Sequence, residues 1–227
     1  MSPPRDSAIS SLQGPRQTLR SLRPAIRIVV ASTVGTAVIA TFLDTASRTA
    51  INPFNFFGFF TMQSNIMTAV VLLVTAVLEF SRRPTPAWLV PVRAATTTYM
   101  VVVGVVYNLL LAGLAGGVDL AWANWVLHVA FPIYAFLDWL LAADRYRLPF
   151  TTIGLILIYP LTWCAVILVR GATDGWVPYP FLNPATGYGS VAIYVLVIAV
   201  AFAAFGALII AISRTRLPWA QRSTNTQ

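Results

Sequence analysis

Six long apolar runs constrain this chain more than any other feature of its sequence. Each run is long enough to cross ~30 Å of hydrocarbon as an α-helix. We expect helices because lipid offers no hydrogen-bond partner to the backbone, and because the runs are too uniformly apolar for the strands of a barrel. The runs are Ala25–Leu43, Phe56–Phe80, Leu89–Ala115, Trp122–Ala143, Phe150–Val169 and Ser190–Ile212.

Composition supports a location in lipid, because 58% of the residues are hydrophobic and only 10% are charged. A soluble globule of this length would lack the polar surface to cover itself. We therefore predict an all-α, polytopic membrane protein, a bundle of six transmembrane helices over residues 25–213. Residues 1–24 are rich in Ser, Pro and Arg, and we expect a disordered cytoplasmic tail there. Residues 214–227 are predicted to form a short cytoplasmic tail.

Arginine supplies all of the basic charge, since the sequence contains no lysine. All arginines except Arg48 and Arg170 fall on one side of the six-span arrangement. The positive-inside rule then predicts that both termini are cytoplasmic, in a multi-pass protein of the plasma membrane. The arginines form no basic face with interleaved aromatic residues, so we expect membrane lipids rather than nucleic acid as partners.

Metal and cofactor motifs are not found. Cys164 is the only cysteine and His128 the only histidine, which excludes an internal disulfide and a multi-cysteine zinc site. The sequence also lacks a phosphate-binding glycine loop and a GxSxG elbow. We therefore expect no metal and no cofactor.

Polar residues form a stripe along the second run. Helical spacing places them on one face, because their offsets are three, four and seven residues. The stripe consists of Thr61, Ser64, Asn65 and Thr68. Such side chains can simply bond a neighbouring helix or their own backbone, and the alternative is a functional site.

His128 lies in the fourth run and shares a helical face with Asn124 and Pro132. A lone histidine within a membrane can be a neutral packing residue or a functional one. In the predicted topology, Thr61 and His128 both lie ~9 Å inside the outer boundary. Two helices could therefore bring the hydroxyl and the imidazole together.

The loop over residues 170–184 is the longest on the non-cytoplasmic side and is dense in Pro, Gly and aromatic residues. One interpretation is an ordered lid over the outer mouth, with Arg170, Tyr179 and Asn183 as candidate lid residues. The other is an interfacial loop anchored by Trp176 and Tyr179.

Charged residues at the opposite side are Glu79, Arg93 and Asp138. Asp138 can pair with Arg93, or both side chains can extend to the interface. Transport would require buried charges along a path through the midplane.

Short motifs give a resemblance to a known family. They are FFTMQSN at 59–65, His128, and a stretch from Arg170-Gly171 to the segment YPFLN at 179–183. Together they resemble the androgen-induced-gene family and its bacterial relatives, predicted six-span membrane proteins. Animal members hydrolyse fatty-acid esters of hydroxy fatty acids with a threonine and a histidine. The resemblance implies those catalytic roles for Thr61 and His128, and a lipophilic ester as substrate.

This chemistry is physically reasonable for the residues concerned. A threonine hydroxyl needs an adjacent base, and His128 is the side chain suited to move protons near neutral pH. The oxyanion would need donors, for which Asn65, Asn124 and Gln63 are candidates in that order. The alternative is a non-catalytic protein, which binds or transports a small lipophilic ligand or supports another membrane protein.

Overall fold

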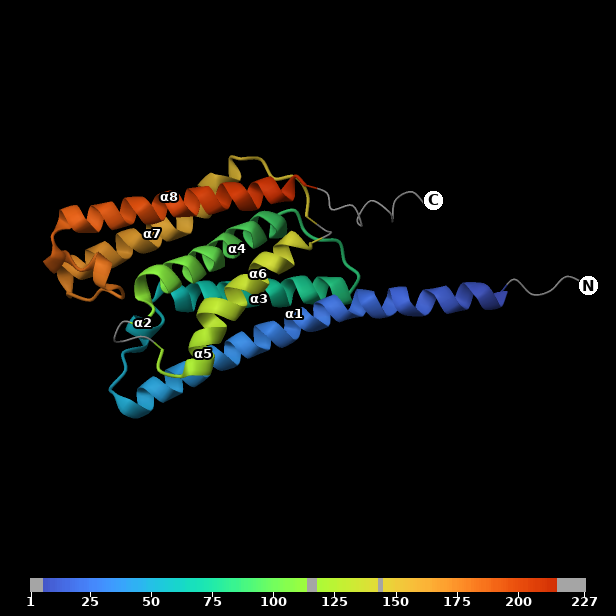
Figure 1. Ribbon diagram of the computed structural model, residues 1–227, viewed down its shortest axis with the longest axis horizontal. Helices are drawn as coiled ribbons and strands as arrows, with labels where there is room; N and C mark the ends of the chain where they lie inside the picture. The colour runs from blue at the N-terminus through green and yellow to red at the C-terminus, as the bar shows by residue number, and fades with distance from the viewer. Residues whose placement is uncertain (1–5, 114–117, 143–144, 216–227) are drawn as a thin grey trace, which may run out of the picture.

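The computed structural model describes residues 6–113, 118–142 and 145–215, and these residues form helices and no strands. The all-α prediction is confirmed. Six helical stretches lie along one another as a bundle (Figure 1). The α-helices are α1 (Asp6–Arg48), α2 (Pro53–Phe56), α3 (Phe60–Phe80), α4 (Leu89–Val106), α5 (Ala121–Trp125), α6 (Phe131–Leu140), α7 (Thr152–Thr173) and α8 (Tyr188–Ser213). The shorter helices are the π-helical η1 (Tyr107–Leu111) and η2 (Val126–Ala130), and the 3₁₀-helical η3 (Pro180–Leu182) and η4 (Pro184–Thr186).

Five helical stretches in the described part of the chain are long and apolar enough to cross a membrane. They are Leu22–Arg48, Phe60–Phe80, Leu89–Leu111, Thr152–Thr173 and Tyr188–Ser213. The remaining predicted run, Trp122–Ala143, corresponds to α5, η2 and α6 and does not reach the same apolarity. The physical reason is that it carries Asn124, His128 and Asp138, whose polar groups lower its hydropathy.

The first helix is longer than the first apolar run. Residues 6–24, where the sequence predicts an irregular tail, continue α1 in the structure. The Leu, Gln and Arg residues of this segment have good helix propensity, and extending an existing helix is much easier than nucleating one. An apolar pattern therefore marks where a helix can lie in lipid, and not where it begins.

α4 lies at the centre of the bundle and packs against α3, α6, α7 and α8. One apolar cluster joins it to α7 and α8, and a second joins α1 and α3 to the stretch around η2. Gly104 allows a close approach within this packing, because a Cβ atom there would lie 3.0 Å from Cβ of Pro132. The absence of a side chain at Gly104 thus brings the end of α4 directly against η2 and α6.

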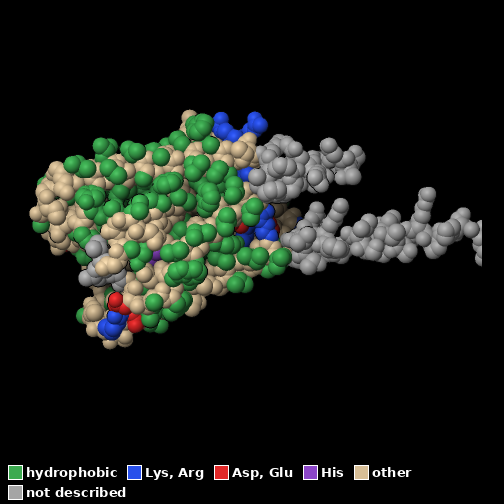
Figure 2. Space-filling view, viewed as in Figure 1, with side chains coloured by type: hydrophobic (Ala, Val, Ile, Leu, Met, Phe, Trp, Pro, Cys, Tyr) green, Lys and Arg blue, Asp and Glu red, His purple; other side chains and the backbone are tan. Residues whose placement is uncertain are grey.

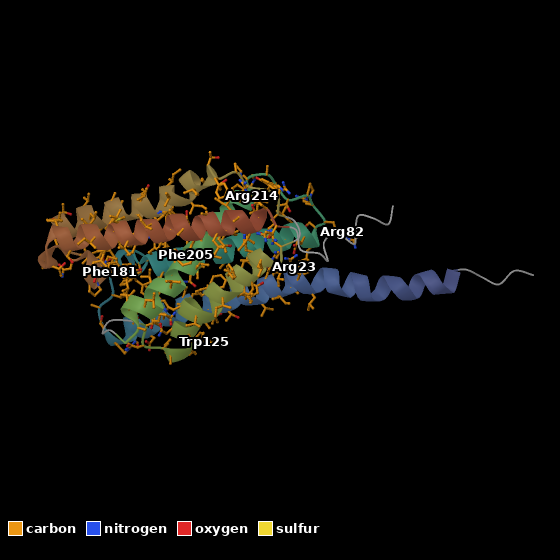
Figure 3. All side chains as sticks on the ribbon, turned by 45° about the horizontal axis from the view of Figure 1, so that its top comes forward. Arg23, Arg82, Trp125, Phe181, Phe205 and Arg214 are labelled. Carbon is orange, nitrogen blue, oxygen red and sulfur yellow. The ribbon has the colours of Figure 1, made fainter. Side chains whose placement is uncertain are left out.

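The two ends of the bundle differ in charge. Figure 2 shows hydrophobic side chains over the body of the bundle. Basic side chains gather mainly at one end, where the C-terminal end of α8 and the N-terminal part of α1 lie. Arg23, Arg82 and Arg214 lie at this end, and Phe181 lies at the opposite one (Figure 3). We call the first the charged end and the second the cavity end.

Candidate functional site

A narrow apolar cavity of about 70 Å³ lies between α4, α7 and α8 at the cavity end. A water molecule needs only about 10–15 Å³ on a comparable measure, so the space can hold several atoms of a chain. Leu161 of α7 is among the lining residues and is half exposed. Three residues that carry hydroxyl groups are among the lining residues, which are otherwise mainly aliphatic and aromatic: Thr61, Tyr107 and Tyr179.

Thr61 is the second residue of α3, and the N-cap residue Phe59 makes no side-chain hydrogen bond to cap the helix. The hydroxyl oxygen of Tyr179 takes that place, because it accepts the backbone N–H of Thr61 at 3.3 Å. The same oxygen lies 3.4 Å from Oγ1 of Thr61. A tyrosine 118 residues away in the sequence therefore caps the first turn of α3 and contacts the candidate nucleophile.

Aromatic rings hold Tyr179 in place. Phe59 meets its ring edge-on at 5.7 Å, and Phe181 stacks on it at 5.3 Å. Trp163 lies beside it at 5.9 Å and donates its indole N–H to the carbonyl of Gly58. Burial raises the pKa of the Tyr179 hydroxyl, with contacts to the start of α3 opposing the effect, so the group stays protonated at neutral pH.

His128 lies in η2, where its ring stacks on Tyr107 with centroids 3.8 Å apart. Its Nδ1 atom is 3.1 Å from the backbone oxygen of Asn124. Because a carbonyl oxygen only accepts, this contact assigns the proton of the neutral ring to Nδ1 and leaves Nε2 as an acceptor. Nε2 is therefore the atom of His128 that can take up a proton.

The structure brings the turns containing Thr61 and His128 together, but not the two functional groups into a hydrogen bond. Among the described residues, the Thr61 hydroxyl contacts Tyr179 and the His128 ring nitrogen contacts Asn124. Asn65 connects the two turns, because its Nδ2 atom donates to the carbonyl of Thr61 at 2.8 Å and to that of Leu127 at 3.3 Å.

Pro132 explains why side-chain amides collect at this point. It has no backbone N–H, so this position offers no helical donor to the carbonyl of His128, four residues earlier, or to that of Leu127, five residues earlier. Asn65 donates to the carbonyl of Leu127, and Asn108 donates to that of His128 at 3.4 Å. The sequence signal for these contacts was a proline inside one apolar run and an asparagine inside each of two others. Which asparagine meets which carbonyl depends on the packing.

The amides predicted as oxyanion donors have other partners. Asn65 bonds the backbone as described above, Asn124 donates to the hydroxyl of Tyr107 at 2.6 Å, and Gln63 donates to the carbonyl of Phe57 at 2.8 Å. None of the three amides lines the described cavity. Their role in this structure is to hold helices and turns together.

The loop after α7 packs onto the segment before α3. Arg170 donates to the side chain of Asn55 at 2.9 Å, lies over the ring of Trp176 at 4.3 Å and pairs with Asp174 at 2.7 Å. The backbone N–H of Trp176 and the Arg170 guanidinium hold the pKa of Asp174 below its usual range. A Cβ atom at Gly58 would lie 2.7 Å from the Trp176 ring, so this contact is close.

The three candidate lid residues thus have different positions. Tyr179 contacts Thr61, and Arg170 ties the loop to Asn55. Asn183 instead accepts the backbone N–H of Ala185 and caps η4 within the loop.

At the charged end, four buried or half-buried charges join α1, α3, α4 and α6. Arg27 pairs with Glu79 at 2.7 Å and with Asp138 at 2.9 Å, and Arg93 lies 3.3 Å from Asp138. Pairing between Asp138 and Arg93 is confirmed. Arg27 lies near the start of the first apolar run, and its side chain is 0% exposed and central to this charged cluster. A single charge inside the first apolar run was the available signal.

Comparison with protein family models, curated proteins and solved structures gives no match. Within the described residues, no three His, Cys, Asp or Glu side chains are close enough to hold a metal ion. The cavity and its three hydroxyl groups are therefore the features from which a function can be inferred.

Proposed function

We propose that this protein binds the acyl chain of a lipid ester in the cavity and hydrolyses the ester with Thr61 and His128. The observation that carries the proposal is the position of Thr61, which lines an apolar cavity whose lining also includes the half-exposed Leu161. A chain can enter there from lipid while its ester group remains near the loop at the cavity end.

The topology that we propose has six membrane crossings, cytoplasmic termini and a location in the plasma membrane. The concentration of arginines at the charged end supports it, because positive residues favour the cytoplasmic side. In this topology the stretch α5–η2–α6 is a crossing in addition to the five long apolar helices, and its polar His128 is only 5% exposed. The cavity then lies toward the outer leaflet.

In the proposed reaction, Oγ1 of Thr61 attacks the ester carbonyl carbon and its proton passes to Nε2 of His128. The alcohol leaves with that proton. A water molecule deprotonated by His128 then attacks the acyl group, the bond to Oγ1 of Thr61 breaks, and His128 returns the proton to Oγ1. The Thr61 hydroxyl must turn from Tyr179 toward His128 for the first step. Catalytic hydrogen bonds are often long or misaligned without substrate, and the 3.4 Å contact with Tyr179 is a weak one to exchange.

The test uses purified protein in detergent, a fluorophosphonate probe and long-chain esters. We expect Thr61→Ala and His128→Ala to lose probe labelling and turnover, and Thr61→Ser to retain both. Thr68→Ala is the matched control, because Thr68 lies on the same face of α3 but bonds the carbonyl of Ser64 at 2.7 Å and does not line the cavity. Equal labelling and turnover in all variants would refute the proposal.

A second candidate is a protein that binds a lipophilic ligand without catalysis. The contact of Thr61 with Tyr179, and the lack of a described hydrogen bond between Thr61 and His128, favour it. This candidate predicts that a lipid ester binds the wild type and the Thr61→Ala variant, and that neither hydrolyses it.

A further inference from the structure

The hydroxyl proton of Tyr179 makes no short hydrogen bond to an acceptor among the described residues. A tyrosine hydroxyl has one donor site and can also accept, and the oxygen of Tyr179 accepts the backbone N–H of Thr61. The one described acceptor for its proton is Oγ1 of Thr61 at 3.4 Å. Good O–H···O bonds are about 2.5–3.0 Å long, so a better acceptor in the cavity would displace this contact.

The position of this hydroxyl is fixed before any ligand binds. The ring of Tyr179 is 9% exposed and lies between Phe59 and Phe181, while its oxygen is anchored to the start of α3. A donor held in this way needs little reorganisation when charge develops on an adjacent oxygen. Burial, which raises the pKa of Tyr179, also keeps the proton on the oxygen.

The lining of the cavity narrows the class of ligand. Its described residues include hydroxyl groups but no Arg, Lys, Asp, Glu or His. A phosphate or a free carboxylate would enter this cavity without a charged partner, which is costly in an apolar surrounding. A neutral carbonyl requires only a hydrogen-bond donor.

We infer that Tyr179 donates its hydroxyl proton to the carbonyl oxygen of the bound lipid and that the site selects neutral carbonyl compounds over anionic lipids. Tyr179, rather than Asn65, Asn124 or Gln63, is then the oxyanion donor. The catalytic part of this inference rests on the proposed function.

The donor acts in the step in which Oγ1 of Thr61 bonds to the carbonyl carbon. The π electron pair of the carbonyl moves to its oxygen, which Tyr179 stabilises, and the proton of Thr61 moves to Nε2 of His128. When the carbonyl re-forms, the bond to the alkoxy oxygen breaks, and His128 returns the proton to that oxygen. Tyr179 keeps its own proton throughout.

The experiment compares the wild type with Tyr179→Phe, which retains the ring and removes the hydroxyl. Tyr99→Phe is the matched control, because that hydroxyl is also buried but donates to the carbonyl of Ile156 at 3.0 Å, outside the cavity lining. The probes are two long-chain compounds brominated at the chain end, a methyl ketone and the hydrocarbon with a methylene group in place of the carbonyl. Binding is measured by quenching of tryptophan fluorescence, since Trp163 lines the cavity.

We expect the wild type and Tyr99→Phe to prefer the ketone roughly fivefold, and Tyr179→Phe to lose this preference. Turnover of esters by Tyr179→Phe should fall roughly 10- to 100-fold in kcat with a smaller change in KM. The ketone preference is a ratio measured within one variant, so partial unfolding does not imitate its loss. A brominated fatty acid at a pH where it is ionised should bind more weakly than the ketone.

An unchanged ketone preference in Tyr179→Phe would overturn the inference even if Thr61→Ala abolishes hydrolysis. If no variant hydrolyses any ester but only Tyr179→Phe loses the ketone preference, the proposed hydrolysis fails and the role of Tyr179 as a ligand donor is supported.

Discussion

The charged end and the cavity end bury polar groups in different ways. At the charged end, full charges from four helices pair with one another, as Arg27 does with Glu79 and Asp138. At the cavity end, the buried polar groups that line or flank the cavity are neutral hydroxyl, amide and imidazole groups, and the contact between Thr61 and Tyr179 is long, at 3.4 Å.

The difference suggests separate roles for the two ends. A buried charge that loses its partner is strongly destabilising, so the charged cluster restricts how α1, α3, α4 and α6 can be arranged. Neutral groups with long hydrogen bonds can exchange partners at low cost. The cavity end can therefore accept a ligand while the charged end holds the helices.

The largest expected effect is that of Asp138→Asn, because this change removes the carboxylate that pairs with both Arg27 and Arg93. We expect a loss of about 3–5 kcal/mol in stability. The measurement is the fraction of protein that stays monodisperse in size-exclusion chromatography after heating in detergent.

Asp119→Asn is the control for this variant. Asp119 pairs with Arg48, but its side chain is 64% exposed, so its removal should cost less than about 1 kcal/mol. If the two variants lose stability equally, the charged cluster does not hold the bundle together.

A medium effect is expected for Gly58→Ala at the cavity end. The new Cβ atom would lie 2.7 Å from Trp176 and 2.8 Å from the carbonyl of Phe54, so the loop must move. We expect a cost of about 1–3 kcal/mol, a change in tryptophan fluorescence and faster proteolysis within residues 174–187. Gly154→Ala, which meets nothing within 4 Å, should show none of these changes.

The smallest effect concerns the amide that joins the two turns of the site. Asn65→Ala leaves the carbonyl of Leu127 without this donor and should cost about 1 kcal/mol. Pro132→Ala supplies a backbone N–H nearby, so the same Asn65→Ala change should cost less in that background. A double-mutant cycle of thermal stability measures this coupling, and strictly additive effects would show that Pro132 does not create the need for Asn65.

Prediction from sequence succeeded where local composition decides the outcome. Five of the six predicted runs are long apolar helices in the structure. The predicted ends lie within a few residues of the helix ends, except at the start of α1. The polar positions of interest were also visible, because a Thr, His or Asn inside an apolar run is conspicuous. The hydrogen-bond partners of these polar residues were not visible in the sequence. Asn65, Asn124 and Gln63 bond groups that no local pattern specifies.

Two residues show what requires the folded chain. Tyr179 belongs to a loop that the sequence assigns equally to a lid or to the interface, yet it caps α3 and contacts Thr61. Arg27 lies at the edge of an apolar run, where a charge can extend to the interface or be buried. Only the convergence of α1, α3 and α6 provides Glu79 and Asp138 as its partners.

The sequence by itself determined that the chain forms long apolar helices and where polar groups interrupt them, because hydropathy and backbone hydrogen bonding act within each segment. The tertiary structure decided which polar groups meet. Partner choice depends on helix rotation, on close approach at Gly104 and on the path of the loop after α7, and these are set by packing between segments distant in the sequence.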